Sequence, residues 1–336
     1  MKRRGFLRAL GSGVAGILTP KLLAATSIVR PSDRLTARFI ERWSWAMGQA
    51  VHLQLFARSE DEGYAAAAAA LAELRRVESR LTLFDDASDL SELNRRAGRV
   101  HLRGDHDLVT VLRAALRLER ASAGAFNPAV EPLMRAWGFR EPRSTEPTRA
   151  EIAEARDAVT AARIRIRGDD IWLPSSHTRL DLGGVAVGYG LDRAITVLRE
   201  AGIRSAFLDI SGDCYALGAP PGAEEGWLVE TANPKLGEQP VGSTRMRDAA
   251  LATSANTMSV VRYGRAVRGH VMNPETGWPA DALTQVTVVA RTGIEADALS
   301  TAMLVSGKPA DGVLTALYPS VRSSTSLTPG PAPDPG

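Results

Sequence analysis

The stretch from Leu180 to Gly218 constrains the fold of this 336-residue chain more than any other. A short apolar segment leads into the glycine pair Gly183-Gly184, and apolar residues recur at helical spacing from about Val187. Gly202 is placed to end that helix, and the apolar run Ser205 to Ile210 is typical of a strand. The order of turn, helix and strand predicts a mixed domain in which a helix packs against a sheet.

The glycine turns of this stretch are candidates for phosphate binding. Gly183-Gly184 opens the helix, and a second turn, Ser211-Gly212-Asp213, follows the strand. Unpaired N–H groups and the positive end of a helix dipole favour a phosphate at such a turn. Glycine turns also serve packing alone, and this spacing is neither the dinucleotide fingerprint nor the Lys-Ser/Thr phosphate loop. Both interpretations remain open at this point.

Composition limits the classes of protein to consider. With 44% hydrophobic residues the chain can bury a large core, and its net charge of +3 is scattered among acids, so no nucleic-acid partner is indicated. The single cysteine, Cys214, excludes an internal disulfide and a cysteine-based zinc site.

The first 26 residues carry the features of an export signal. Arg3-Arg4 is followed by Phe6-Leu7, which resembles the signal read by the twin-arginine export machinery. The apolar run Ala9 to Leu18 is shorter than the roughly 20 residues that span a bilayer, so no stable transmembrane segment is expected. We therefore expect a periplasmic protein.

The remaining chain predicts one α+β domain, residues 35–320, and a disordered tail, residues 321–336. Helices are expected at residues 65–79, 88–94, 106–121 and 295–304, and strands at 51–56, 227–231, 245–253, 267–273 and 285–290. A loop is expected at residues 143–149 and a hydroxyl-rich turn at residues 253–256.

Three residues are candidates for chemistry from their surroundings in the sequence. His270 is the one histidine at the end of a predicted strand beside a polar turn, where a structural role is the alternative. Asp297 and Thr301 lie four apart on one helical face and offer the oxygen ligands that Mg²⁺ prefers.

Taken in order, seven motifs resemble the FAD:protein FMN transferase family, also called the ApbE family. They are Ser88-x-Leu90-Ser91-x-Leu93-Asn94; Gly124-Ala125-Phe126-x-Pro128; Leu180-Asp181-Leu182-Gly183-Gly184-x-Ala186-x-Gly188-Tyr189; Gly212-Asp213; Thr253-Ser254; His270-x-x-x-Pro274-x-Thr276-Gly277-x-Pro279; and Ala296-Asp297-Ala298-Leu299-x-Thr301. The resemblance implies the fold of that family. It also implies an enzyme that uses Mg²⁺ to split the pyrophosphate of FAD, moves FMN to a Ser or Thr hydroxyl of a target flavoprotein and releases AMP.

The resemblance also implies roles for individual residues. His270 would take the proton of the incoming hydroxyl, and Asp297 and Thr301, with the carbonyl of Ala186, would bind the metal. The residues expected to contact FAD are Met47, Asn127, Asp181, Gly183, Gly184, Gly188, Gly212, Asp213, Thr253, Ser254 and Thr276.

Several positions depart from the family pattern. Val187 stands where the family has a lysine, and Asn127 and Ala129 stand for an Asp and a Thr. Asn273 and Asn256 stand where the family has Asp. Two alternatives to transfer therefore remain: an FAD-binding protein without transferase activity, and a Mg²⁺-dependent FAD hydrolase that uses water as the nucleophile.

Overall fold

The computed structural model describes residues 37–232, 240–257, 259–281, 283–308, 318 and 320–327. Its centre is a seven-stranded antiparallel sheet in the order β1-β2-β6-β7-β10-β13-β14. The strands are β1 (Arg38–Ala46), β2 (Gln49–Ala57), β6 (Ser205–Ile210), β7 (Asp213–Leu217), β10 (Ala249–Ala255), β13 (Leu283–Ala290) and β14 (Arg322–Leu327). The model confirms the predicted α+β class.

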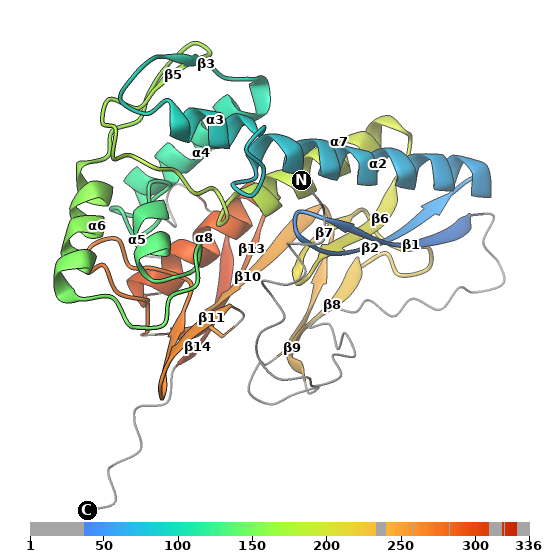
Figure 1. Cartoon of the computed structure of the whole chain (residues 1–336). Helices are drawn as coiled ribbons and strands as arrows, with labels where there is room; N and C mark the ends of the chain where they lie inside the picture. Colours follow the sequence, from blue (N-terminus) through green and yellow to red (C-terminus); the bar gives the residue numbers. More distant parts are fainter. Residues whose placement is uncertain are drawn as a thin grey trace, which may run out of the picture.

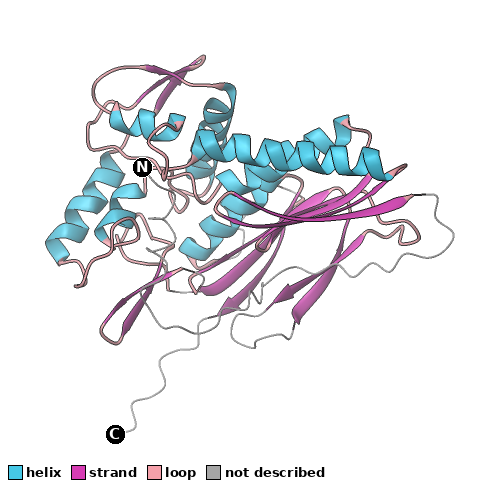
Figure 2. Ribbon diagram, turned by 45° about the vertical axis from the view of Figure 1, so that its right-hand side comes forward, coloured by secondary structure: helices cyan, strands magenta, loops and turns pink. Residues whose placement is uncertain are grey.

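Three long helices cover one face of this sheet (Figures 1 and 2). They are α2 (Glu60–Leu81), α7 (Ala186–Glu200) and α8 (Gly293–Ser306). The other helices gather beside α7 and α8: α3 (Asp89–Arg95), α4 (His106–Ala121), α5 (Glu131–Ala136) and α6 (Arg149–Ala161). Small sheets complete the fold, made of β3 (Leu102–Arg103), β4 (Arg165–Arg167) and β5 (Asp170–Trp172); β8 (Trp227–Ala232) and β9 (Pro240–Met246); and β11 (Val260–Tyr263) and β12 (Ala266–Gly269).

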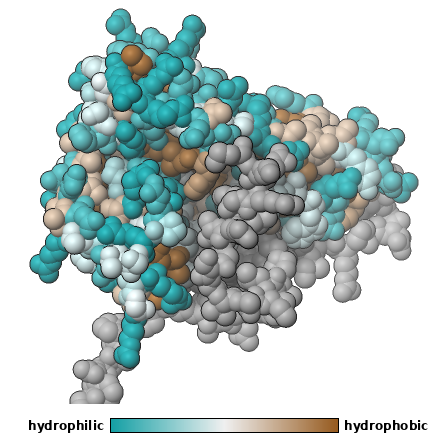
Figure 3. Space-filling model, viewed as in Figure 1, coloured by the Kyte–Doolittle hydropathy of each residue, from teal (hydrophilic) through white to brown (hydrophobic). Residues whose placement is uncertain are grey.

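The main hydrophobic core lies between the helices and the sheet. Alternate residues of the strands, such as Leu53 in β2 and Leu208 in β6, are fully buried there with Leu74 of α2 and Leu191 of α7. The opposite sheet face packs on the β8–β9 hairpin through Trp227, and in the view of Figure 3 the surface of the described residues is mainly hydrophilic. Among the described residues, no helix is both long and apolar enough to cross a membrane.

Two predicted elements near residue 250 differ from the structure. The strand expected at residues 245–253 is divided between β9 and β10, because the chain bends at Asp248, whose φ is 49°. The turn expected at residues 253–256 is wrong, since Thr253 to Ala255 pair with β13 to the end of β10. Tertiary pairing decided this segment, whose hydroxyl-rich sequence favours a turn.

The strand expected at residues 267–273 ends earlier, and the first part of the segment expected to be disordered is a strand. β12 stops at Gly269, where an added Cβ would lie 2.5 Å from the Asn256 carbonyl oxygen, and His270 follows the strand. Residues 322–327 form β14 against β13, because the open edge of β13 offers backbone partners to a polar sequence. The export signal, residues 1–26, and residues 328–336 lie outside the described residues.

Candidate functional site

The backbone that leads into α7 is held by the side chain of Asn94, at the end of α3. Asn94 Nδ2 donates to the Leu180 carbonyl over 2.9 Å, and Asn94 Oδ1 accepts from the Leu180 N–H over 2.7 Å. One buried amide thus satisfies both backbone groups, and the segment needs no neighbouring strand. The short apolar segment before this helix, residues 180–182, belongs to no sheet.

The glycine turn that follows lies against the side chain of Thr301. Asp181 Oδ1 accepts from the Gly183 N–H over 2.8 Å, which fixes the turn. A Cβ added at Gly184 would lie 3.1 Å from Thr301 Oγ1 and 3.4 Å from the Phe126 ring. The turn therefore comes close to one of the predicted metal ligands because position 184 has no side chain.

Gly188 brings α7 into contact with α8. Its N–H donates to Asp297 Oδ2 over 3.0 Å, and a Cβ there would lie 2.1 Å from the Gly293 carbonyl oxygen. Asp192 of α7 accepts from the N–H groups of Gly293 and Ile294 over 2.6 and 3.0 Å, which caps the start of α8. Gly188 thus has a packing reason to be glycine and also orients the Asp297 carboxylate.

Two carboxyl groups act on each other here: Asp297, which is buried one helical turn before Thr301, and Asp213, which is half-buried. Asp213 Oδ1 accepts from the Thr253 N–H over 3.0 Å, and the Ser254 hydroxyl lies 3.1 Å from Thr301 Oγ1. Burial raises the pKa of Asp213 to about 7. Burial, and then the charge of Asp213, raises the pKa of Asp297 well above its usual range.

This donor set fits an oxygen-preferring cation. Asp297 offers a carboxylate and Thr301 a hydroxyl, and Ala186 is the first residue of α7, two positions before Gly188. In the described ranges no three His, Cys, Asp or Glu side chains cluster as a metal site, so a cation here would also need hydroxyl, carbonyl or phosphate oxygens. A cation would offset the cost of placing the Asp297 and Asp213 carboxylates together, because no Lys or Arg of the described residues acts on either one.

His270 follows the end of β12, and the charges of Asp181 and Arg140 both act on its imidazole. The backbone N–H of His270 donates to the Ser259 carbonyl over 3.1 Å. The imidazole Nδ1 is buried without a hydrogen-bond partner. The ring of Phe139 meets the imidazole edge-on at 6.4 Å. Burial lowers the pKa of His270, so the neutral imidazole that a general base needs is favoured.

The other residues predicted to contact FAD have the following neighbours. Met47, in the β1–β2 turn, would touch a Cβ at Gly190 of α7 at 3.6 Å, and the Gly212 N–H donates to Asp209 Oδ1 over 2.8 Å. The Thr276 hydroxyl accepts from the Trp278 N–H over 3.2 Å. Asn127 lines a cavity of about 790 Å³, together with Asn273 and Ala302 of α8.

The amides and the valine that depart from the family pattern have local partners. Asn127 Oδ1 accepts from the Ala129 N–H over 2.8 Å, and Asn273 Oδ1 accepts from the Glu275 and Thr276 N–H groups. Asn256 donates to the Ala280 carbonyl and accepts from the Val271 N–H, which uses both ends of an amide. Val187 is buried in the main core.

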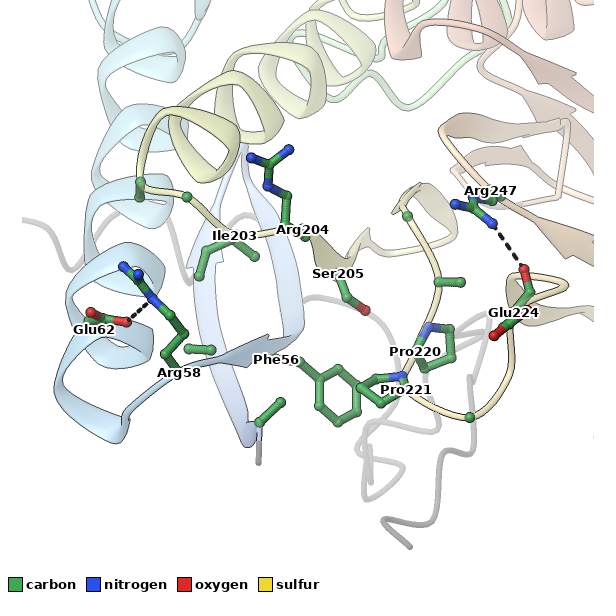
Figure 4. Close-up of a pocket in the computed structure, with 17 residues that line it drawn as sticks. Phe56, Arg58, Glu62, Ile203, Arg204, Ser205, Pro220, Pro221, Glu224 and Arg247 are labelled. Atoms are coloured by element: carbon green, nitrogen blue, oxygen red, sulfur yellow. Dashed lines mark hydrogen bonds and ion pairs between the residues drawn. The ribbon is translucent and has the colours of Figure 1, made fainter. Parts of the chain in front are cut away.

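Another cavity lies elsewhere in the molecule. It has a volume of about 1010 Å³ and is bounded by the end of β2, the start of β6 and the loop after β7 (Figure 4). None of the predicted site residues lines it. Gly202, just beyond the end of α7, lines this cavity, whereas the glycine turn lies before the start of α7. The two are therefore separated by the length of the helix, roughly 22 Å.

Sequence reasoning missed two groups that the structure places in the site. Arg140 is one arginine in an arginine-rich chain, and nothing in its neighbours indicates that it pairs with Asp181. Asp192 follows the glycine motif at helical spacing and gives no sign that it caps another helix. Asn94 lies within a quoted motif, but its two bonds to Leu180 required the tertiary structure.

Known proteins resemble this chain over most of its length. Residues 47–318 match the family model of the ApbE family. An FAD:protein FMN transferase of Treponema pallidum is 27% identical over 305 residues, which cover 86% of this chain and 84% of that protein. One of Rhodobacter capsulatus is 31% identical over 209 residues, 61% of this chain and 39% of that protein.

Solved structures agree with the fold. The ApbE protein of Thermotoga maritima aligns with a TM-score of 0.78 and 25% identity, covering 86% of this chain and 94% of that chain. The apo flavinyl transferase ApbE of Pseudomonas stutzeri aligns with a TM-score of 0.75 and 23% identity, covering 89% and 94%. Sequence match, fold and the order of the motifs agree, and the chain belongs to the ApbE family.

Proposed function

We propose that this protein transfers FMN from FAD to a Ser or Thr hydroxyl of a target flavoprotein, with Mg²⁺ bound at Asp297 and Thr301, and releases AMP. The observation that carries the proposal is the contact between the Gly183-Gly184 turn and Thr301, one helical turn from Asp297. A phosphate at the turn would lie beside the oxygen donors. The relatives named FAD:protein FMN transferase support the same reaction.

Different residues of the chain would have different roles in this reaction. The acceptor oxygen forms a bond to the phosphorus of the FMN half of FAD, the pyrophosphate P–O bond to the AMP half breaks, and the hydroxyl proton passes to the His270 imidazole. Backbone N–H groups at the glycine turn and the start of α7 would hold the phosphates. Asp297 and Thr301, with the Ala186 carbonyl, would hold Mg²⁺, which when bound neutralises charge on the pyrophosphate oxygens.

The test is a transfer assay with three outcomes. The full chain is incubated with FAD, Mg²⁺ and a purified flavoprotein domain that carries an acceptor threonine, and the acceptor is weighed by mass spectrometry while AMP is measured. Transfer predicts one FMN on the acceptor and one AMP per event, both lost when the acceptor threonine is replaced by valine.

The two alternatives give different results. AMP and free FMN at equal rates with and without acceptor would mean an FAD hydrolase. Bound FAD that yields neither product would mean a flavin-binding protein, and either result would overturn the proposed transfer.

A further inference from the structure

Arg140 forms an ion pair that no motif predicted, with Asp181, which lies two residues before the glycine turn. The side chains are 15% and 10% exposed, and Arg140 Nη2 donates to Asp181 Oδ2. Asp181 Oδ1 accepts from the Gly183 N–H over 2.8 Å. One carboxylate therefore binds the arginine with one oxygen and the turn with the other.

Arg140 is itself held in place by its surroundings. It follows Phe139 in the loop after α5, where the Phe139 N–H donates to the Met134 carbonyl over 2.9 Å. The Phe139 ring meets His270, and the Arg140 guanidinium lies 5.4 Å from the centre of the Phe84 ring. The loop thus brings the Phe139 ring to the imidazole of His270 and the Arg140 cation to the carboxylate of Asp181.

Two buried atoms in this region have no hydrogen-bond partner: His270 Nδ1 and Arg140 Nε. Both are nitrogens of groups that can carry positive charge: the guanidinium is paired with Asp181, and the imidazole contacts the ring of Phe139, the residue before Arg140. A charge left without its partner here would be poorly screened, because little water reaches the site. The protonation of His270 should therefore depend strongly on whether the carboxylate is paired.

We propose that Arg140 is a positioning residue that neutralises Asp181 and so keeps His270 in its neutral, proton-accepting form. Asp181 would then act on the reaction through the glycine turn and His270, instead of contacting FAD directly. This inference rests on the proposed function for its meaning in catalysis, but the charge coupling itself can be tested without substrate.

The charges that act on His270 agree with the role proposed for Arg140. Asp181 raises and Arg140 lowers the pKa of the imidazole, while burial has the largest effect and lowers it. The nearest other arginine in sequence, Arg268 of β12, has its own partner, Glu146, at 2.7 Å. Removal of Arg140 would leave the Asp181 charge unopposed next to the imidazole.

The experiment is an NMR titration of the histidine side chains in the full chain, without FAD, metal or acceptor, with the His270 signal assigned by its loss in His270→Gln. In Arg140→Gln we expect the His270 midpoint to move up by about one pH unit, because an unpaired carboxylate favours the imidazolium. In Asp181→Asn we expect a downward move. The double variant should titrate near the wild type.

Controls separate charge from a loss of structure. Arg268→Gln removes a neighbouring ion pair of the same kind and should leave the midpoint unchanged. Arg140→Lys keeps the charge and should restore most of the wild-type value. Equal midpoints in wild type, Arg140→Gln and Asp181→Asn, or moves of both in the same direction, would overturn the proposal.

The same variants separate this inference from the transfer reaction. In the transfer assay the acid limb of the rate profile should follow the NMR midpoints. If the midpoints move as expected but no variant, the wild type included, transfers FMN, the charge coupling stands and the proposed function fails. If transfer occurs and the midpoints do not move, the coupling fails alone.

Discussion

The N–H of Gly188 donates to Asp297 Oδ2 over 3.0 Å, where α7 contacts α8. A Cβ at position 188 would lie 2.1 Å from the Gly293 carbonyl oxygen and 2.8 Å from the Asp297 Cβ. The same contact therefore packs two helices and aims the carboxylate proposed to bind the metal. Backbone atoms on one helix set the direction of a side chain on the other.

Gly188→Ala should separate the two helices. We expect a loss of about 1–3 kcal/mol in the free energy of unfolding, as for overpacking of a close contact, and a smaller rise in melting temperature when Mg²⁺ is added. Thermal unfolding with and without Mg²⁺ measures both. Gly190→Ala is the matched control, because a Cβ there meets the ends of the Leu74 and Met47 side chains at 3.3 and 3.6 Å. Equal effects of the two variants would contradict the packing explanation.

Asp297→Asn should stabilise the protein without metal. A carboxyl group whose pKa is raised by folding destabilises the folded state at any pH above the pKa of an ordinary aspartate. Its removal should therefore raise the melting temperature at pH 8. Asparagine can still accept from the Gly188 N–H. The stabilisation that Mg²⁺ gives to the wild type should be lost.

Asp209→Asn is the control for a buried carboxyl group outside the proposed site. Burial raises the pKa of Asp209 to about 7, so this variant should also melt higher at pH 8 than the wild type. It should keep the full response to Mg²⁺. A lost response in Asp209→Asn, or a retained one in Asp297→Asn, would argue against the proposed ligands.

His270→Ala should leave FAD and Mg²⁺ binding intact and slow transfer by roughly 10²- to 10⁴-fold, the usual contribution of a general base. In the wild type, transfer should fall as the pH drops through the pKa of His270, because the protonated imidazole cannot accept the hydroxyl proton. Burial places that pKa below the ordinary value of 6.5. Pre-steady-state transfer rates across pH, with flavin fluorescence for binding, test both statements. An unchanged rate in His270→Ala would remove it as the base.

Replacement of both Arg3 and Arg4 by lysine should retain the precursor in the cytoplasm, because the twin-arginine machinery reads the arginine pair. Cell fractionation and immunoblotting measure the exported fraction. The same exchange at Arg95-Arg96, in the folded domain, should not change export. Normal export of the signal variant would point to another route.

The sequence alone determined the elements whose signal is local. Helices α4 and α7 and strand β6 lie within one residue of their predicted bounds, because apolar spacing and flanking glycine or aspartate decide such segments. It also placed Asp297 and Thr301 on one face of a helix, since residues four apart share a face. The motif order was enough to identify the family.

Only the tertiary structure decided which of these residues meet. Thr253 and Ser254 have a turn-like sequence but lie in a strand, because β13 provides a ladder of partners. Residues 180–182 have a strand-like sequence but lie outside any sheet, because the Asn94 amide satisfies Leu180. The pairing of Arg140 with Asp181 joins positions 41 apart and leaves no periodic trace in the chain. Such contacts depend on where whole elements pack, and local propensity does not record that.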